Sequence, residues 1–178
     1  VLGQVTAIMA VTVFLLSPFA GGVIDRTARR TILFVAQVVQ MLQAFALAAL
    51  TFSGQIEVWH VFVLSAVRGV ANAFDAPTRQ SFYVELVDDR EDLSNAIALN
   101  STLMSTARIL GPSLGGVIVA VLGSAWAFTL NGLSFVAILG ALLLMRLPNR
   151  EFSPSGRSPL QDMGDGLRFI LGNRLITG

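Results

Sequence analysis

The stretch Gly21–Arg30, with the sequence GGVIDRTARR, decides the fold of this chain. It gathers one acid and three arginines, and a long apolar run lies on each side of it. A dense charge cluster between two apolar runs is typical of a short loop at a membrane surface, because charged side chains are costly inside the hydrocarbon core. The stretch therefore predicts that both flanking runs cross a bilayer.

The overall composition points to the same class of protein. Of the 178 residues, 54% are hydrophobic and 13% are charged, whereas a soluble domain carries about 25% charged residues. The net charge of +1 offers no basic surface for nucleic acid. Because the chain has no cysteine and a single histidine, we expect no metal site and no cofactor.

Five apolar segments are long enough, or nearly so, to cross a bilayer as helices. Each is expected to be helical, since backbone polar groups inside hydrocarbon must bond within their own segment. The segments are Val1–Ala20, Ile32–Phe52, Val58–Phe74, Ile97–Val121 and Ala125–Met145. The predicted fold is therefore an all-α integral membrane bundle of five transmembrane helices, followed by a cytoplasmic linker.

The arginines set the expected orientation of the helices. Loop arginines follow the first, third and fifth segments, and the two intervening turns, Ser53–Glu57 and Gly123–Ser124, carry none. Loops rich in arginine stay on the cytoplasmic side of a cell membrane. We therefore expect a multi-pass protein of the inner or plasma membrane, with cytoplasmic segments that include Arg26, Arg79 and Arg146.

The last part of the chain differs from the rest. Arg146–Pro159 has three prolines and three serines, as a linker would, and Leu160–Ile176 has the periodicity of an amphipathic helix. We divide the chain into transmembrane helices over 1–147 and a cytoplasmic linker with this helix over 148–178. Since the chain starts with Val inside an apolar run, we expect it to be a fragment.

Five positions of the charged stretch resemble the motif GxLADRxGRK, four by identity and the last as arginine in place of lysine; this motif lies between the second and third helices of the major facilitator superfamily. The matching residues are Gly21, Asp25, Arg26, Arg29 and Arg30. A Val-Ile pair replaces the Leu-Ala pair, and alanine replaces the inner glycine of the motif. This second change bears on the tight turn of the motif, because alanine tolerates positive φ poorly.

Three further stretches carry the resemblance to this superfamily. LSAVRGVANA, which contains Arg68, resembles the fourth helix, and Arg108–Gly116 resembles the GPxxGG motif of the fifth helix in exporters and antiporters. Asn131–Phe135 resembles the sixth helix of the siderophore and drug exporter branch. The resemblance implies helices two to six of a twelve-helix fold, together with the linker between its halves.

The resemblance also implies a function. It implies a secondary active transporter that exports a small molecule by alternating access, in exchange against protons. The expected partners are a small-molecule substrate, for which the arginines favour an anionic compound, protons, the lipid bilayer and the second half of the same transporter. A membrane enzyme and a non-transporting scaffold or receptor are the alternatives. The chain has no lysine and therefore no GxxxxGK phosphate loop.

Three polar residues within the apolar segments are the candidates for substrate binding or coupling: Arg68, Asn72 and Arg108. Arg68 and Asn72 share one helical face with Asp75 and Arg79, and such a polar face must meet protein or water rather than lipid. The alternative for Arg68 is an ion-pair network that holds helices together. No acid lies at the depth of Arg108, so its counter-charge is expected outside this chain.

Two further sets of residues complete the candidate sites. The resemblance implies a cytoplasmic gate formed by Gly21, Asp25, Arg26, Arg29, Arg30 and Asp75, with Asp75 or Glu85 as a partner for Arg29 or Arg30. It also implies a helix-bend motif formed by Gly111, Pro112, Gly115 and Gly116, for which close helix packing is the alternative reading. Three glutamines are predicted to form hydrogen bonds between helices: Gln37, Gln40 and Gln43.

Overall fold

The computed structural model describes residues 2–24, 26–86 and 90–145. Within these ranges the chain forms five helices and no strand, which confirms the prediction of an all-α membrane fold. The helices are α1 (Leu2–Ile24), α2 (Arg29–Phe52), α3 (Val58–Leu86), α4 (Arg90–Leu122) and α5 (Ser124–Leu144). All but α3 are long and apolar enough to cross a membrane. Polar residues such as Arg68 and Asn72 interrupt the apolar run of α3.

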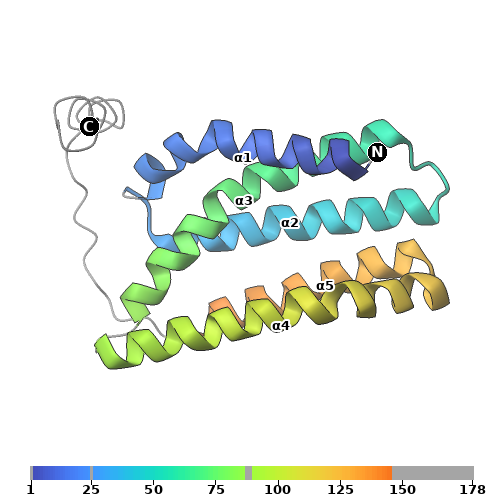
Figure 1. Cartoon of the computed structure of the whole chain (residues 1–178). Coiled ribbons are helices and arrows are strands. Elements are labelled where there is room, and N and C mark those ends of the chain that lie inside the picture. Colours follow the sequence, from blue (N-terminus) through green and yellow to red (C-terminus); the bar gives the residue numbers. More distant parts are fainter. Residues whose placement is uncertain (1, 25, 87–89, 146–178) are drawn as a thin grey trace, which may run out of the picture.

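Helix α2 lies at the centre of the described bundle (Figure 1). It packs against α3 and α5, and α1 packs against α3. The buried residues of α2 recur at a spacing of three and four, as expected for a helix with one broad face in the core. The order of packing is therefore α1, α3, α2, α5.

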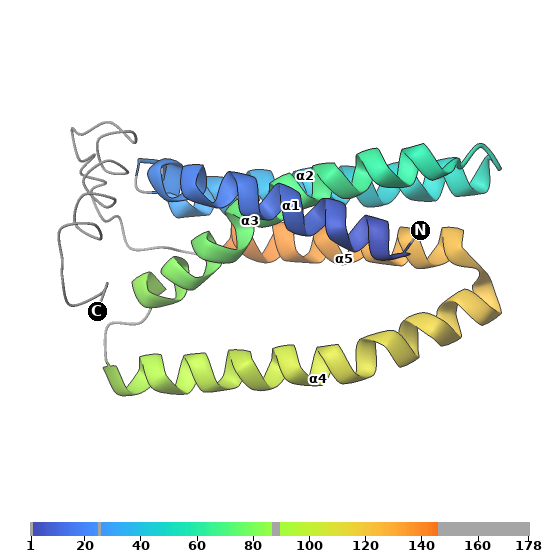
Figure 2. The ribbon, with the colours of Figure 1, turned by 45° about the horizontal axis from the view of Figure 1, so that its top comes forward.

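Helix α4 runs apart from the other four helices, and its second half turns towards the start of α5 (Figure 2). Its described neighbours are chiefly α5 and, more weakly, α3. No side chain between residues 94 and 122 is buried. This apolar helix therefore offers most of its surface to lipid or to further protein.

Two short turns close the end of the bundle that lacks arginine. Each contains a glycine with positive φ, Gly54 between α2 and α3 with φ 69° and Gly123 between α4 and α5 with φ 87°. Only glycine adopts this conformation readily. The two glycines thus explain why these helices reverse direction within so few residues.

Both tryptophans of the chain lie at this same end. Trp126 packs edge-to-face on Phe52 with ring centroids 5.7 Å apart, and Trp59 donates a hydrogen bond of 2.6 Å to Glu57. Tryptophans gather where a membrane meets water, because their rings are amphipathic. Their position supports a membrane boundary at this end, a signal that the arginine pattern did not supply.

The helices extend beyond the apolar segments predicted from the sequence. Helix α3 continues past Phe74 to Leu86, so the prediction that Arg79 lies in a loop is wrong. Helix α4 begins at Arg90 rather than at Ile97. Amphipathic turns carry these helices beyond their apolar cores, and a hydropathy pattern does not detect such turns. The predicted linker and its amphipathic helix lie outside the described residues.

Two glycines allow close approach of neighbouring helices. A Cβ atom at Gly69 of α3 would lie 3.0 Å from Cβ of Thr12 in α1. A Cβ atom at Gly132 of α5 would lie 2.8 Å from the ring of Phe45 in α2. Small residues at such contacts let helix backbones pack tightly in a membrane, where no hydrophobic force drives helices together.

The substitution Gly132→Val should destabilise the bundle by about 1–3 kcal/mol, because the added side chain overpacks the contact with Phe45. Gly140→Val is the matched control, since no atom lies within 4 Å of a Cβ at that position on the same helix. Thermal unfolding of the complete protein in detergent compares the two variants. Equal unfolding temperatures would contradict a tight contact between α2 and α5.

Candidate functional site

Arg30, at the start of α2, binds the end of α5. Its Nη2 donates hydrogen bonds to the carbonyl oxygens of Leu142, at 2.7 Å, and Leu143, at 3.0 Å. The last carbonyls of a helix have no partner within the helix and carry partial negative charge. Arg30 satisfies two of them and thereby joins the charged stretch to the exit of α5.

Asp75 of α3 lies between two partners. Its Oδ1 accepts a hydrogen bond of 2.7 Å from Nε2 of Gln37, and its Oδ2 forms an ion pair of 2.8 Å with Arg79. The interhelical role predicted for Gln37 is thus confirmed. Of the partners expected for Arg29 or Arg30, Asp75 does not pair with Arg30: Arg79, one turn away on α3, reaches Asp75, whereas Arg30 bonds to the carbonyls of α5.

A cavity of about 150 Å³ borders this network of Gln37, Asp75 and Arg79. Gln37 and Arg79 line it, together with apolar side chains of α2, α3 and α5. Gln37 is 1% exposed, and its Oε1 has no hydrogen-bond partner among the described residues. The cavity is large enough to admit a water molecule beside the network.

The remaining residues of the predicted gate differ in how far their side chains are exposed. Gly21 is exposed near the end of α1, Arg26 is exposed in the loop and Arg29 is half-buried at the start of α2. Asp25 lies outside the described residues. Ala28 has a φ of −55°, so the turn needs no positive φ at this position and accepts alanine without strain.

Arg68 and Asn72 lie on an exposed face of α3. Asn72 lines a hollow of about 550 Å³ whose other walls come from α1, among them Thr6 and Ser17. Arg68 forms no ion pair with any residue that the structure describes. These two polar side chains thus face outwards from the described helices.

Arg108 is likewise exposed, on α4. The motif residues that follow it, Gly111, Gly115 and Gly116, have no atom within 4 Å of an added Cβ. These glycines therefore do not contact another described helix. Pro112 lies inside α4, which continues as a helix beyond the proline. The structure does not bring the substrate candidates of α3 and α4 together within this bundle.

No three His, Asp or Glu side chains gather as a metal site would require within the described part of the chain. The contact that sequence reasoning missed is the bond from Arg30 to α5. Basic residues can bond to the last carbonyls of a helix. The sequence alone does not show that Arg30 lies beside the end of α5, so this contact could be identified only from the fold.

Replacing Arg30 with alanine should lower the stability by about 1.5–3 kcal/mol, because the bonds from a charged donor to two helix-end carbonyls are lost. Arg30→Lys should retain part of this stability through its charge. Arg26→Ala is the control, since Arg26 is exposed in the same loop. If Arg26→Ala and Arg30→Ala unfold alike, the bond to α5 contributes nothing.

A family model described as transmembrane secretion effector matches residues 2–176 of this chain. The chain is 26% identical to an uncharacterised MFS-type transporter of Bacillus subtilis, YfiS, over 90% of the chain and 38% of that protein. It is 28% identical to the staphyloferrin A transporter of Staphylococcus aureus, over 80% and 36%. Macrolide efflux protein A of Enterococcus faecalis is 24% identical, over 88% and 49%.

The chain thus spans between about a third and a half of the length of these relatives. No solved structure matches it.

Proposed function

Because this chain belongs to the transmembrane secretion effector family of the major facilitator superfamily, we propose that it forms part of a secondary active transporter that exports a small molecule by alternating access. The chain is part of a multi-pass membrane protein. Members of the superfamily are transporters and not enzymes, which excludes the membrane-enzyme alternative.

The observation that carries the proposal is the polar outer face of α3. Arg68 lies in the middle third of this 29-residue helix, exposed and without an ion-pair partner among the described side chains. An unpaired arginine at bilayer depth costs roughly 2.5–3.5 kcal/mol on insertion scales. Such a charge persists where it meets a water-filled path or a substrate, and Asn72, one turn away, lines a hollow shared with α1.

The direction of transport is drawn from the relatives. One is named for macrolide efflux and another for staphyloferrin A, and the family description speaks of secretion. We therefore assign export to this chain, with Arg68, Asn72 and Arg108 towards the substrate path. Two arginines suit an oxygen-rich or anionic substrate, and proton exchange supplies the driving force.

The orientation follows from the charges. The loop Arg26–Arg30 lies at the cytoplasmic side of the plasma membrane, and the end with Trp59 and Trp126 lies outside. The segment contains no cysteine, so a single cysteine can report each side. A membrane-impermeant maleimide added to intact cells should label Gln55→Cys and leave Ala28→Cys unlabelled. The reverse pattern would overturn this orientation.

The test of transport uses the complete gene product that contains these residues. Cells that lack their own exporters and express this protein should accumulate less staphyloferrin A, or less of a macrolide, than cells with an empty vector. A protonophore should raise accumulation to the level of the empty vector. Accumulation that stays low after the protonophore would count against proton exchange. A protein that reaches the membrane and changes the accumulation of neither compound supports the scaffold alternative.

A further inference from the structure

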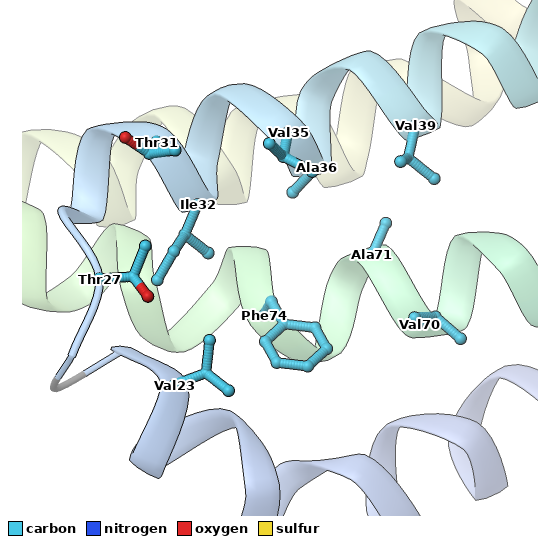
Figure 3. A pocket seen from close by; sticks show the side chains of 10 residues that line it. All are labelled: Val23, Thr27, Thr31, Ile32, Val35, Ala36, Val39, Val70, Ala71 and Phe74. Atoms are coloured by element: carbon cyan, nitrogen blue, oxygen red, sulfur yellow. The ribbon is translucent and has the colours of Figure 1, made fainter.

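An apolar crevice opens at the arginine end of the bundle, between α1, α2 and α3 (Figure 3). It has a volume of about 310 Å³ and is lined almost entirely by hydrocarbon. Three of its wall residues, Val23, Val35 and Val70, are strongly exposed, so the crevice is open to the surroundings of the bundle. In a bilayer these surroundings include lipid.

One end of the crevice lies beside the charged loop, and the other lies farther along α2 and α3. Figure 3 shows Thr27 and Thr31 beside the α1–α2 loop, whereas Val39 and Val70 lie at the far end. Thr31 and Val39 are eight residues apart on α2, which corresponds to about 12 Å along the helix. This length is less than half of a hydrocarbon core of about 30 Å, so the crevice stays within one leaflet.

The charges beside the loop end of the crevice favour an anionic headgroup. Arg26 adjoins Thr27 and is exposed, and Arg29 starts the helix that forms one wall, whereas Arg30 is bonded to the carbonyls at the end of α5. Arginines at a membrane surface attract anionic lipids of the adjacent leaflet. The apolar walls therefore suit an acyl chain, and the arginine rim suits the phosphate at its head.

We propose that this crevice binds one acyl chain of an anionic phospholipid, whose phosphate lies beside Arg26. The lipid fills the space between α1, α2 and α3 and places a negative charge at the charged stretch. The proposal rests on the crevice and its rim, and it holds whether or not the protein transports a solute.

The experiment uses the complete protein in phosphatidylcholine nanodiscs that contain a trace of phosphatidylglycerol with a diazirine on its acyl chain. After illumination, mass spectrometry of peptides should find the label on the crevice walls, and more of it than with a phosphatidylcholine probe. Arg26→Gln should lower this preference by about fivefold, because one arginine near an anionic surface contributes about 1 kcal/mol. A label spread evenly over the exposed apolar faces of α4 and α5 would overturn the proposal.

Two tryptophan variants on α3 provide a matched pair. Val70→Trp fills the crevice and should reduce its labelling several-fold, whereas Val63→Trp lies two turns away on a similar face and should not. Val35→Trp tests the α2 wall if Val70→Trp fails to fold. Absent labelling in the wild-type protein would mean that another protein segment covers the crevice. Displacement of the probe by a transported compound would mean a substrate site. Either result contradicts the proposal.

Discussion

Replacing Arg68 with alanine is expected to abolish transport while the protein still reaches the membrane. Arg68 forms no hydrogen bond or ion pair that holds the described helices together, and its side chain is exposed. The substitution therefore removes no contact between the described helices. A charged side chain is costly to place inside a bilayer, so we expect Arg68 to be kept for function, and its loss should reduce transport. Transport should fall by about tenfold or more, since a loss of about 1.4 kcal/mol in binding already has this effect.

The measurement is the rate of substrate efflux per molecule of protein in the membrane. Arg68→Lys keeps the charge and should retain partial transport, although an ammonium lacks the planar donors of a guanidinium. Gln80→Ala, at an exposed position of the same helix, is the control that should transport normally. If Arg68→Ala transports at the wild-type rate, the functional reading of Arg68 fails and an ion-pair role towards further protein replaces it.

Replacing Asp75 with alanine is expected to cost the largest amount of stability among single substitutions in the bundle. The change leaves the amide of Gln37 and the guanidinium of Arg79 without their acceptor. Breaking a buried ion pair from one side costs about 3–5 kcal/mol. The Asp75 side chain is 9% exposed and that of Arg79 is 32% exposed, so we expect the lower end of this range.

Thermal unfolding in detergent measures the effect, and further variants separate the two contacts. Asp75→Asn keeps an acceptor for Gln37 and loses the ion pair, so its stability should lie between those of Asp75→Ala and the wild type. In Gln37→Leu, Asp75→Ala should cost less than in the wild-type background, because one of the two contacts is already gone. An Asp75→Ala protein that unfolds at the wild-type temperature would falsify the structural role of the network.

The network of Gln37, Asp75 and Arg79 also bears on the gate proposed for the charged stretch Gly21–Arg30. A gate would need charges that exchange partners during transport. Asp75 and Arg30 each have a partner within this bundle, the first in Gln37 and Arg79 and the second in α5. Arg30 and Asp75 stabilise contacts within this bundle, and we keep both in the proposed gate with Gly21, Asp25, Arg26 and Arg29, where their partners would exchange during transport.

Much of the fold could be predicted from the sequence, for reasons that the helices make clear. Apolar runs of membrane-spanning length, or nearly so for α3, predicted every described helix, because a backbone in hydrocarbon must satisfy its own hydrogen bonds. The helix ends could not be predicted in this way. The predicted apolar segment ends at Phe74 and Arg79 is expected in a loop, yet α3 continues to Leu86, and Asp75 and Arg79 pair one turn apart inside it.

The sequence by itself determined the class of protein, the number of described helices and the family, because these depend on local composition, on length and on short motifs. Only the tertiary structure decided which polar groups meet. It brought Arg30 to the end of α5, 112 residues later, and Gln37 to Asp75, and it formed the apolar crevice from three helices. Such contacts depend on how the helices face one another, and helix rotation follows from packing between side chains rather than from hydropathy.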